Sequence, residues 1–469
     1  MASAPIHFNA FDMLVPVHQS PGLWRHPESR IDEFDTLQYW TELSQTLERA
    51  GFTSLFLADI PGIYDVFGSS HHAAARGGVQ YPLLDLQVLV PALAAATTHL
   101  GFGITTSVTY EQPYLLARRF ATLDHLTGGR IAWNVVTSYQ DSAARNLGLE
   151  RQIPHDERYD RADEFMEVMY KLFERSFDDD AVAADRESGT FVDPEKVRGI
   201  GHRGRWFSVP GEMLTHPGPQ RTPLLFQAGS SARGQQFAVD HGEAIFVSNA
   251  DPGKLAAQVG STRAALTAAG RDPQWVKFSA LATVIVAETE ALAWERLQDY
   301  KQYVDTEAAL TLFGGWTGVD LSGVAEEEFV VDVQTEANQS ALAMFTKDPA
   351  KRWTVRDVAE FISIGGRGPL FIGDPAQVVD QLVAFQRATG VDGFNISAAV
   401  RPADFERFEH YVTPELKRRG LLAERPDEPV TLREALLGAG PHLASDHPAR
   451  RRAEATPDSR IPADVAADR

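Results

Sequence analysis

The chain of 469 residues contains no cysteine. This absence excludes thiolate catalysis, disulfide bonds, and zinc or iron–sulfur sites held by cysteine ligands. It also leaves the redox compartment open, because cysteine usage is the feature that would report it. We expect no metal site, and any redox chemistry in this protein would need a borrowed cofactor.

Positive charge is scarce as well. The formal net charge is −20 at pH 7, from 44 basic and 64 acidic side chains. Nucleic acids and anionic membranes attract basic surfaces, so we expect neither as a partner. The apolar and charged fractions are otherwise ordinary for a globular protein with a full core.

Long hydrophobic runs are also missing. The most apolar segment, residues 81–98, is interrupted by Pro82, Asp85, Gln87 and Pro91, which favours a buried helix over a membrane span. The N-terminal sequence MASAPIHFNAFDMLVP has no basic segment followed by an apolar run, so it does not resemble a secretion signal. We therefore expect a cytoplasmic protein.

Eight short apolar runs alternate with helical stretches along the chain. The runs are residues 6–13, 54–58, 100–106, 131–136, 224–228, 244–247, 278–286 and 393–396. Such alternation predicts an α/β fold with a parallel sheet, and eight strands favour closure into a (β/α)8 TIM barrel. An open doubly wound sheet is the alternative, but no GxGxxG motif follows the first strand.

Two long segments interrupt this alternation, and a third ends it. Residues 178–205 are acidic and loose, which predicts a surface insertion after the fourth strand. The lid segment, residues 306–353, is too long for a simple connection after the seventh strand, and we expect it to fold over the barrel mouth. We place the barrel at residues 1–437 and a flexible tail at residues 438–469, which is rich in Pro, Ala and charge.

The segment LDHLTGGRIAWNVVTSYQDSAARNLGL, residues 123–149, indicates a site. Gly128 and Gly129 allow a helix to end and the backbone to reverse. The strand 131–136 then runs into Thr137 and Ser138, so apolar groups give way to hydrogen-bonding groups where a parallel strand reaches a pocket. An ordinary helix–strand connection with a helix cap would follow the same pattern.

Other candidate site residues also follow predicted strands. Asp59 ends the second strand, where barrel enzymes place working residues, although it could equally cap the next loop. The sequence AGSS, residues 228–231, precedes a helix and so predicts an anion site, although serine is also a common helix cap. His155 and Tyr159 are four residues apart and share a face if a helix starts early enough.

Several longer strings are similar to one known family. They are NAFDM, HQSPGLWRHPESR, FLAD, GGRIAWNVVTS, HDERYDRADEF, QAGSS and FGGWTGVDLSG, in that order. Together they resemble the bacterial-luciferase-like flavin monooxygenases, in the branch of the nitrilotriacetate, EDTA and dibenzothiophene-sulfone monooxygenase large components. The resemblance implies a (β/α)8 barrel that binds FMN, reduced by a separate flavin reductase, and uses it with O2 to oxygenate or cleave a small organic substrate.

The resemblance also implies roles for individual residues. The positions that match the family's flavin-binding residues are Asp59, Thr105 or Thr106, Asn134, His155, Tyr159, and Ser230 or Ser231. Ser230, Ser231 and the N–H of Gly229 would meet the phosphate, with Tyr159 adding a hydroxyl. Asn134 and the threonine would bond the polar edge of the flavin ring.

We expect His18 and Trp24, in the long loop after strand one, and Trp316, in the lid segment, to close over the flavin and line the substrate pocket. Ordinary core packing is the alternative for both tryptophans. We also expect a homo-oligomer, a dimer or a tetramer.

Other functions remain possible on the same barrel. They are riboflavin degradation, deazaflavin-dependent hydride transfer, and flavin binding without catalysis. Arg25, Arg30 and Arg76 are the conspicuous basic residues near the predicted mouth loops. Because a polycarboxylate would need several such groups, the sequence favours a neutral or aromatic substrate.

Overall fold

A computed structural model describes residues 5–450. Eight parallel strands form a closed barrel, since β10 pairs with β11 and β1 pairs with β13. The barrel strands are β1 (His7–Met13), β2 (Ser54–Ala58), β3 (Gly101–Ser107), β4 (Ile131–Val136), β9 (Leu224–Gln227), β10 (Ala244–Val247), β11 (Lys277–Val286) and β13 (Gly393–Ile396). The predicted TIM barrel is confirmed, and the open sheet is excluded.

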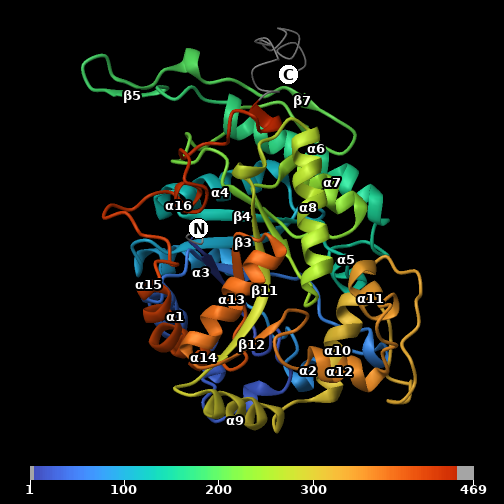
Figure 1. Cartoon of the computed structure of the whole chain (residues 1–469). Coiled ribbons are helices and arrows are strands. Elements are labelled where there is room, and N and C mark those ends of the chain that lie inside the picture. Colours follow the sequence, from blue (N-terminus) through green and yellow to red (C-terminus); the bar gives the residue numbers. More distant parts are fainter. Residues whose placement is uncertain (1–4, 451–469) are drawn as a thin grey trace.

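Helices surround this barrel (Figure 1). Those packed around it are α1 (Leu37–Arg49), α3 (Leu86–Ala95), α4 (Pro113–Thr127), α6 (His155–Arg175), α7 (Ala232–His241), α8 (Pro252–Ala268), α9 (Glu290–Lys301), α13 (Pro375–Thr389), α14 (Ala403–Arg407) and α15 (Thr413–Arg418). Short helices α2 (His72–Gly77) and α5 (Asp141–Asn146) lie in loops that follow β2 and β4. No helix within residues 5–450 has both the length and the apolar character needed to cross a bilayer.

The connection from α4 to β4 forms as the sequence predicts. Pro113 occupies the first turn of α4, where its missing N–H costs nothing. Gly128 and Gly129 have φ values of 63° and 82° and end the helix. β4 follows at once and is buried along most of its length, so Thr137 and Ser138 emerge at the barrel mouth.

The barrel interior is filled in layers. Near the floor, Asn9 bonds Asn395 at 2.9 Å and accepts a hydrogen bond from Ser54 at 2.8 Å. An aromatic layer lies two residues further along the strands and includes Phe11, Phe56, Phe226 and Phe246. This filling makes the barrel a packed core, so a ligand can enter only above the aromatic layer.

The last helix, α16 (Leu432–Leu437), closes the floor of the barrel. Leu432, Leu436 and Leu437 belong to the same apolar cluster as the aromatic layer. A Cβ on Gly101, the first residue of β3, would lie 2.5 Å from Cδ1 of Leu432, so only glycine allows the helix to pack so closely.

The two insertions have different structures. Residues 178–205 and the residues that follow them form two hairpins. The first is exposed and pairs β5 (Val182–Asp185) with β6 (Thr190–Val192). The second pairs β7 (His202–Arg203) with β8 (Ser208–Val209) and buries His202 and Val209. The lid segment contains α10 (Thr306–Thr317) and α11 (Gln339–Thr346), which pack with α2 and α12 (Val355–Ile362) around an apolar cluster of their own.

A ninth parallel strand was not predicted. β12 (Leu370–Gly373) pairs with Thr283–Val286 in the second half of β11, while β13 pairs with the first half. β12 has only four residues and follows the glycine-rich loop IGGRG, which hides it from a periodicity argument.

Part of the predicted tail packs on the barrel. Leu443 and His447 are fully buried, and Nε2 of His447 lies 3.1 Å from the carbonyl oxygen of His241. The boundary predicted after residue 437 is therefore too early for residues 438–450. The remainder of the predicted tail, residues 451–469, lies outside the described residues.

Candidate active site

A cavity of about 550 Å³ opens at the C-terminal mouth of the barrel. Its walls come from the ends of β1, β2, β4, β9 and β10, and from the lid segment. This size and this place are typical of small-molecule and cofactor sites in TIM barrels.

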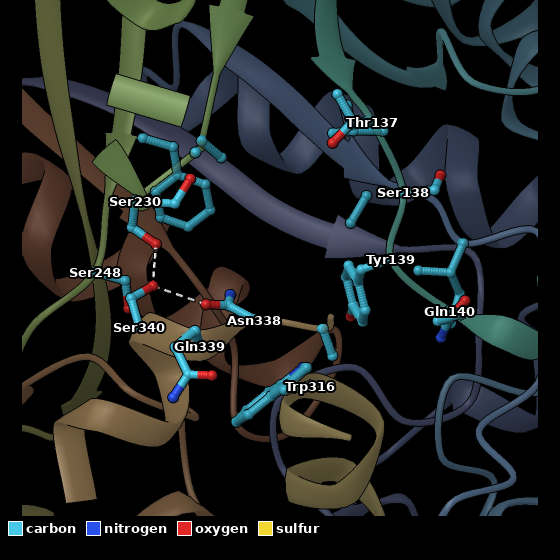
Figure 2. A pocket seen from close by; sticks show the side chains of 18 of the residues that line it. Thr137, Ser138, Tyr139, Gln140, Ser230, Ser248, Trp316, Asn338, Gln339 and Ser340 are labelled. Carbon is cyan, nitrogen blue, oxygen red and sulfur yellow. Dashed lines mark hydrogen bonds between the residues drawn. The ribbon is translucent and has the colours of Figure 1, made fainter. Parts of the chain in front are cut away.

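One end of the cavity, the hydroxyl-rich end, is formed by Ser230, Ser248, Asn338 and Ser340 (Figure 2). The hydroxyls of Ser230 and Ser340 are hydrogen-bonded to each other, and Ser340 donates to Oδ1 of Asn338 at 2.8 Å. The Oγ of Ser248 is buried without a hydrogen-bond partner among the described residues. Ser231 and Asn338 cap α7 and α11, so two helix N-termini also meet at this end.

The lid segment supplies half of this end, which the sequence did not predict. Asn338 and Ser340 lie far from any predicted strand and are brought to Ser230 by the packing of α11. The one available signal was a helix start, since asparagine before the apolar run SALAMF is a common N-cap.

Two of the phosphate-binding groups expected in AGSS already form hydrogen bonds within the protein. The N–H of Gly229 donates to Oε1 of Gln227 at 2.7 Å, so it is not free to meet a phosphate as predicted, although both residues line the cavity. The Oγ of Ser231 accepts from the N–H of Gly234 at 3.0 Å and caps α7. Both serines line the cavity, and Ser230 is the one whose hydroxyl bonds Ser340 at the hydroxyl-rich end.

His155 and Tyr159 both line the cavity. α6 begins at His155, which places the two side chains on one face with ring centroids 5.2 Å apart. A Cβ on Gly229 or Gly234 would lie within 2.8 Å of the Tyr159 hydroxyl, so these glycines leave room for it. Burial raises the pKa of Tyr159, and the phenol is therefore neutral.

Asp59 also lines the cavity, at the end of β2 as predicted. Burial, reinforced by the negative charges of Asp85 and Glu111, raises the pKa of this carboxyl to about 7. Asp59 can therefore either donate or accept a hydrogen bond near neutral pH.

The strand-three threonines point in different directions. Thr105 accepts from Nδ2 of Asn134 at 2.9 Å, and the Oδ1 of Asn134 is buried without a partner among residues 5–450. Thr106 instead accepts from Gln87 of α3, on the outer side of the barrel, so its side chain is not available to a ligand in the cavity. The structure favours Thr105 of this pair. Thr105 and Asn134 lie just beneath the residues that line the cavity.

Tyr139 and Trp316 line another part of the cavity (Figure 2), which we call the aromatic end together with the lining residues His18 and Tyr64. The hydroxyls of Tyr64 and Tyr139 are 3.1 Å apart. A Cβ on Gly315 would lie 2.3 Å from Cγ of Tyr64, so α10 can approach this ring only with glycine there. Burial, together with the positive charge of Arg401, holds the pKa of His18 well below its usual range, which keeps the imidazole neutral.

Trp24 is not part of the site. Its side chain is 43% exposed on the outer surface, and it does not line the cavity, so the predicted role for it is wrong. Trp316, by contrast, is 7% exposed and serves both the cavity wall and the core of the lid segment.

The arginines singled out from the sequence also lie elsewhere. Arg30 binds Glu33 and Glu42, Arg76 pairs with Glu307, and Arg25 donates to the carbonyl of Tyr303. The arginines that line the cavity are Arg158 and Arg367, and neither was predicted.

The donor set fits a flavin mononucleotide. Neutral hydroxyls and two helix N-termini at one end suit a phosphate without any basic side chain. The Asp59 carboxyl lines the cavity, and the partnerless Oδ1 of Asn134 lies one residue before Val135 of the cavity wall, so both groups suit the polar edge of a flavin ring.

The fold and the cavity together define a TIM barrel with a cofactor-sized site at its mouth, and sequence comparison supplies the family. The family model described as luciferase-like monooxygenase matches residues 10–393. The chain therefore belongs to the luciferase-like monooxygenase family, and it is a flavin-dependent monooxygenase.

Two relatives share more than 40% of their residues with this chain. Dimethyl-sulfide monooxygenase of Hyphomicrobium sulfonivorans is 44% identical, over 95% of this chain and 93% of the relative. Long-chain alkane monooxygenase of Geobacillus thermodenitrificans is 42% identical, over 95% and 97%. The predicted branch is confirmed, since dibenzothiophene-sulfone monooxygenase of Rhodococcus erythropolis (strain XP) is 35% identical, over 88% of this chain and 93% of the relative.

Solved structures agree with these relatives. The crystal structure of DmoA from Hyphomicrobium sulfonivorans superposes with a TM-score of 0.89 and covers 96% of each chain. A riboflavin lyase, crystallised with modified FMN and riboflavin, is 38% identical with the same TM-score and covers 95% of this chain and 98% of its own.

Proposed function

We propose that this monooxygenase is the oxygenating component of a two-component system. A separate flavin reductase would supply reduced FMN, and the chain would use it with O2 on a small organic substrate. The observation that supports this most directly is one continuous cavity with a hydroxyl-rich end suited to a phosphate and an aromatic end suited to an organic substrate. A relative that is 31% identical, over 90% of this chain and 94% of its own, is named component A of nitrilotriacetate monooxygenase.

The chain's own residues would bind, orient and enclose. Ser230, Ser340 and Tyr159 would hold the phosphate, while Asn134 and Asp59 would fix the ring. When bound, reduced FMN supplies the electrons with which O2 is activated. The aromatic end would exclude water from that reaction, which is the condition for productive oxygen chemistry.

Oxygen uptake tests the proposal. Purified protein should consume O2 with chemically reduced FMN and a substrate, or with NADH, FMN and a reductase. The assay panel begins with organic sulfides, sulfones and alkanes, because relatives are named for them. Substrate-dependent turnover on NADH and FMN with no reductase present would contradict the two-component assignment.

Riboflavin cleavage is the second candidate, favoured by the 38% identity to riboflavin lyase. It predicts loss of added riboflavin, with release of a ring fragment, in the presence of reduced FMN and O2. Chromatography of the reaction separates the two functions, since a monooxygenase with another substrate leaves riboflavin intact.

A further inference from the structure

Arg367 is a cationic group at the aromatic end of the cavity. Its guanidinium carbon lies 5.2 Å from the centre of the Trp316 ring, a cation–π distance. Within residues 5–450, no carboxylate pairs with it and no hydrogen-bond acceptor contacts it. Burial lowers the pKa of the guanidinium, but an arginine stays protonated at neutral pH.

The loop that carries Arg367 is built tightly around it. Gly365 and Gly366 have φ values of 77° and 70°, which favour glycine. A Cβ on Gly366 would lie 2.1 Å from Oε1 of Gln19, and one on Gly368 would lie 2.6 Å from the carbonyl oxygen of Leu281. The N–H of Gly365 also donates to Oγ of Ser20 at 3.1 Å. Three glycines therefore press the loop against the barrel, and the arginine between them faces the cavity.

The buried arginines among residues 5–450 have acceptors, whereas the partly buried Arg367 has none. Arg401 pairs with Asp12, and Arg433 pairs with Glu243 at 2.8 Å. Arg130 donates to backbone carbonyls of Ala94 and Leu100. A partly buried charge without a partner in the protein costs free energy, so the isolation of Arg367 in an acid-rich chain favours a partner from outside the chain.

The acidic residues of the cavity are engaged elsewhere. The Asp59 carboxyl accepts a hydrogen bond from the backbone N–H of Ile60, and Glu336 accepts from the N–H of His155 at 3.0 Å. The neighbours that feel the charge of Arg367 are the neutral hydroxyls of Tyr64 and Tyr139. The aromatic end therefore offers one cation flanked by neutral hydroxyls, which is the chemistry that binds a carboxylate or sulfonate.

We propose that Arg367 recognises an anionic oxygen group on the substrate, and that the substrate is a small organic acid. Its carboxylate or sulfonate would pair with the guanidinium, and its organic part would extend past Trp316 toward the centre of the cavity. This inference rests on the proposed function, whose substrate site it specifies, and it replaces the neutral substrate that the sequence favoured.

Isothermal titration tests the proposal with benzoate, benzenesulfonate and the uncharged control benzamide. Oxidised FMN is added so that the hydroxyl-rich end is filled. At least one of the two anions should bind the wild type about tenfold to a hundredfold more tightly than benzamide, the range of hydrogen bonds to a charged group. Arg367→Gln should abolish this preference, whereas Arg367→Lys should keep part of it. The anion that binds more tightly shows whether Arg367 recognises a carboxylate or a sulfonate.

The matched control is Arg76→Gln, which removes the same charge from an exposed pair with Glu307 and should change nothing. Three results would overturn the proposal. They are equal binding of anions and benzamide, no binding of either anion, and an anion preference that survives in Arg367→Gln. So would a loss of FMN affinity in Arg367→Gln with anion preference intact, since Arg367 would then serve the flavin. These titrations involve no turnover, so a failure of oxygen uptake would remove the proposed function without deciding the role of Arg367.

Discussion

At the residue scale, neighbouring residues of the AGSS sequence have different structural roles. Ser230 points to the hydroxyl-rich end, Ser231 caps α7, and Gly229 bonds Gln227. A strand followed by a helix start predicts that an anion site lies here, but not which group faces the ligand. That choice depends on backbone torsion angles, and on a serine of the lid segment more than 100 residues later in the chain.

We predict that the two serines respond differently to substitution. Ser230→Ala and Tyr159→Phe should each weaken FMN binding about tenfold, the scale of one hydrogen bond to a charged group. Ser231→Ala should instead lower the free energy of unfolding by about 1 kcal/mol, because it removes the cap of α7. Fluorescence titration with FMN and urea denaturation measure the two effects, and unchanged FMN affinity in both of the first variants would remove the proposed phosphate site.

Asp59 should make the stability of the FMN-free protein depend on pH. Its pKa rises from 3.8 to about 7 on folding, so the folded state holds the proton more tightly. The stability that this carboxyl contributes is present below about pH 4 and is lost as the pH rises to about 7. Asp59→Asn should match the wild type near pH 4 and exceed it above pH 7 by up to about 4 kcal/mol, at about 1.4 kcal/mol for each pKa unit.

The measurement is urea denaturation of both proteins between pH 4 and pH 8. A constant difference across this range would show that Asp59 titrates normally in the folded protein.

At the scale of elements, the sequence predicted those with a regular pattern and missed those fixed by packing. α4 and β4 follow from Pro113, Gly128 and an apolar run. β12 and the loop around Arg367 do not, because four residues after a glycine-rich stretch carry no periodicity. Arg367 was missed for the same reason, since only the fold brings this loop beside Trp316.

α10 carries Trp316, and we predict that this ring limits the access of water to the reacting centre. Trp316→Phe keeps an aromatic ring in the core of the lid segment but leaves space in the cavity wall. The fraction of consumed O2 that is released as hydrogen peroxide should rise, while FMN affinity stays within roughly twofold, about 0.4 kcal/mol. Trp24→Phe, a change on the outer surface, is the control. A loss of stability with an unchanged peroxide fraction would assign Trp316 to packing alone.

At the scale of the whole molecule, α16 ties the C-terminal part of the described chain to the barrel strands. α16 fills the barrel floor beside β3, and Arg433 of this helix forms a fully buried pair with Glu243 before β10. Breaking a buried pair from one side leaves an uncompensated charge, which costs about 3–5 kcal/mol. Arg433→Ala should lower the free energy of unfolding by this amount.

The exposed pair of Arg418 with Glu415 provides the comparison, since Arg418→Ala removes a solvent-screened charge and should change the free energy of unfolding far less. Chemical denaturation of the two variants measures both values. Equal effects would mean that the buried pair contributes no more than a surface one.

The hydrogen bond between Ser230 and Ser340 joins the barrel to the lid segment at the place where we expect the phosphate. If the phosphate binds both Ser230 and Ser340, FMN binding and the closing of α11 are thermodynamically coupled. A change that stabilises the closed position of α11 then strengthens FMN binding by the same free energy. Amide hydrogens of α11 should then exchange more slowly as FMN is added, by up to about 2.7 kcal/mol of protection at a hundredfold excess over Kd. If FMN returns to a separate reductase after every cycle, as the proposed function requires, it can leave only as often as this helix opens, and the opening rate of α11 then sets an upper limit on turnover.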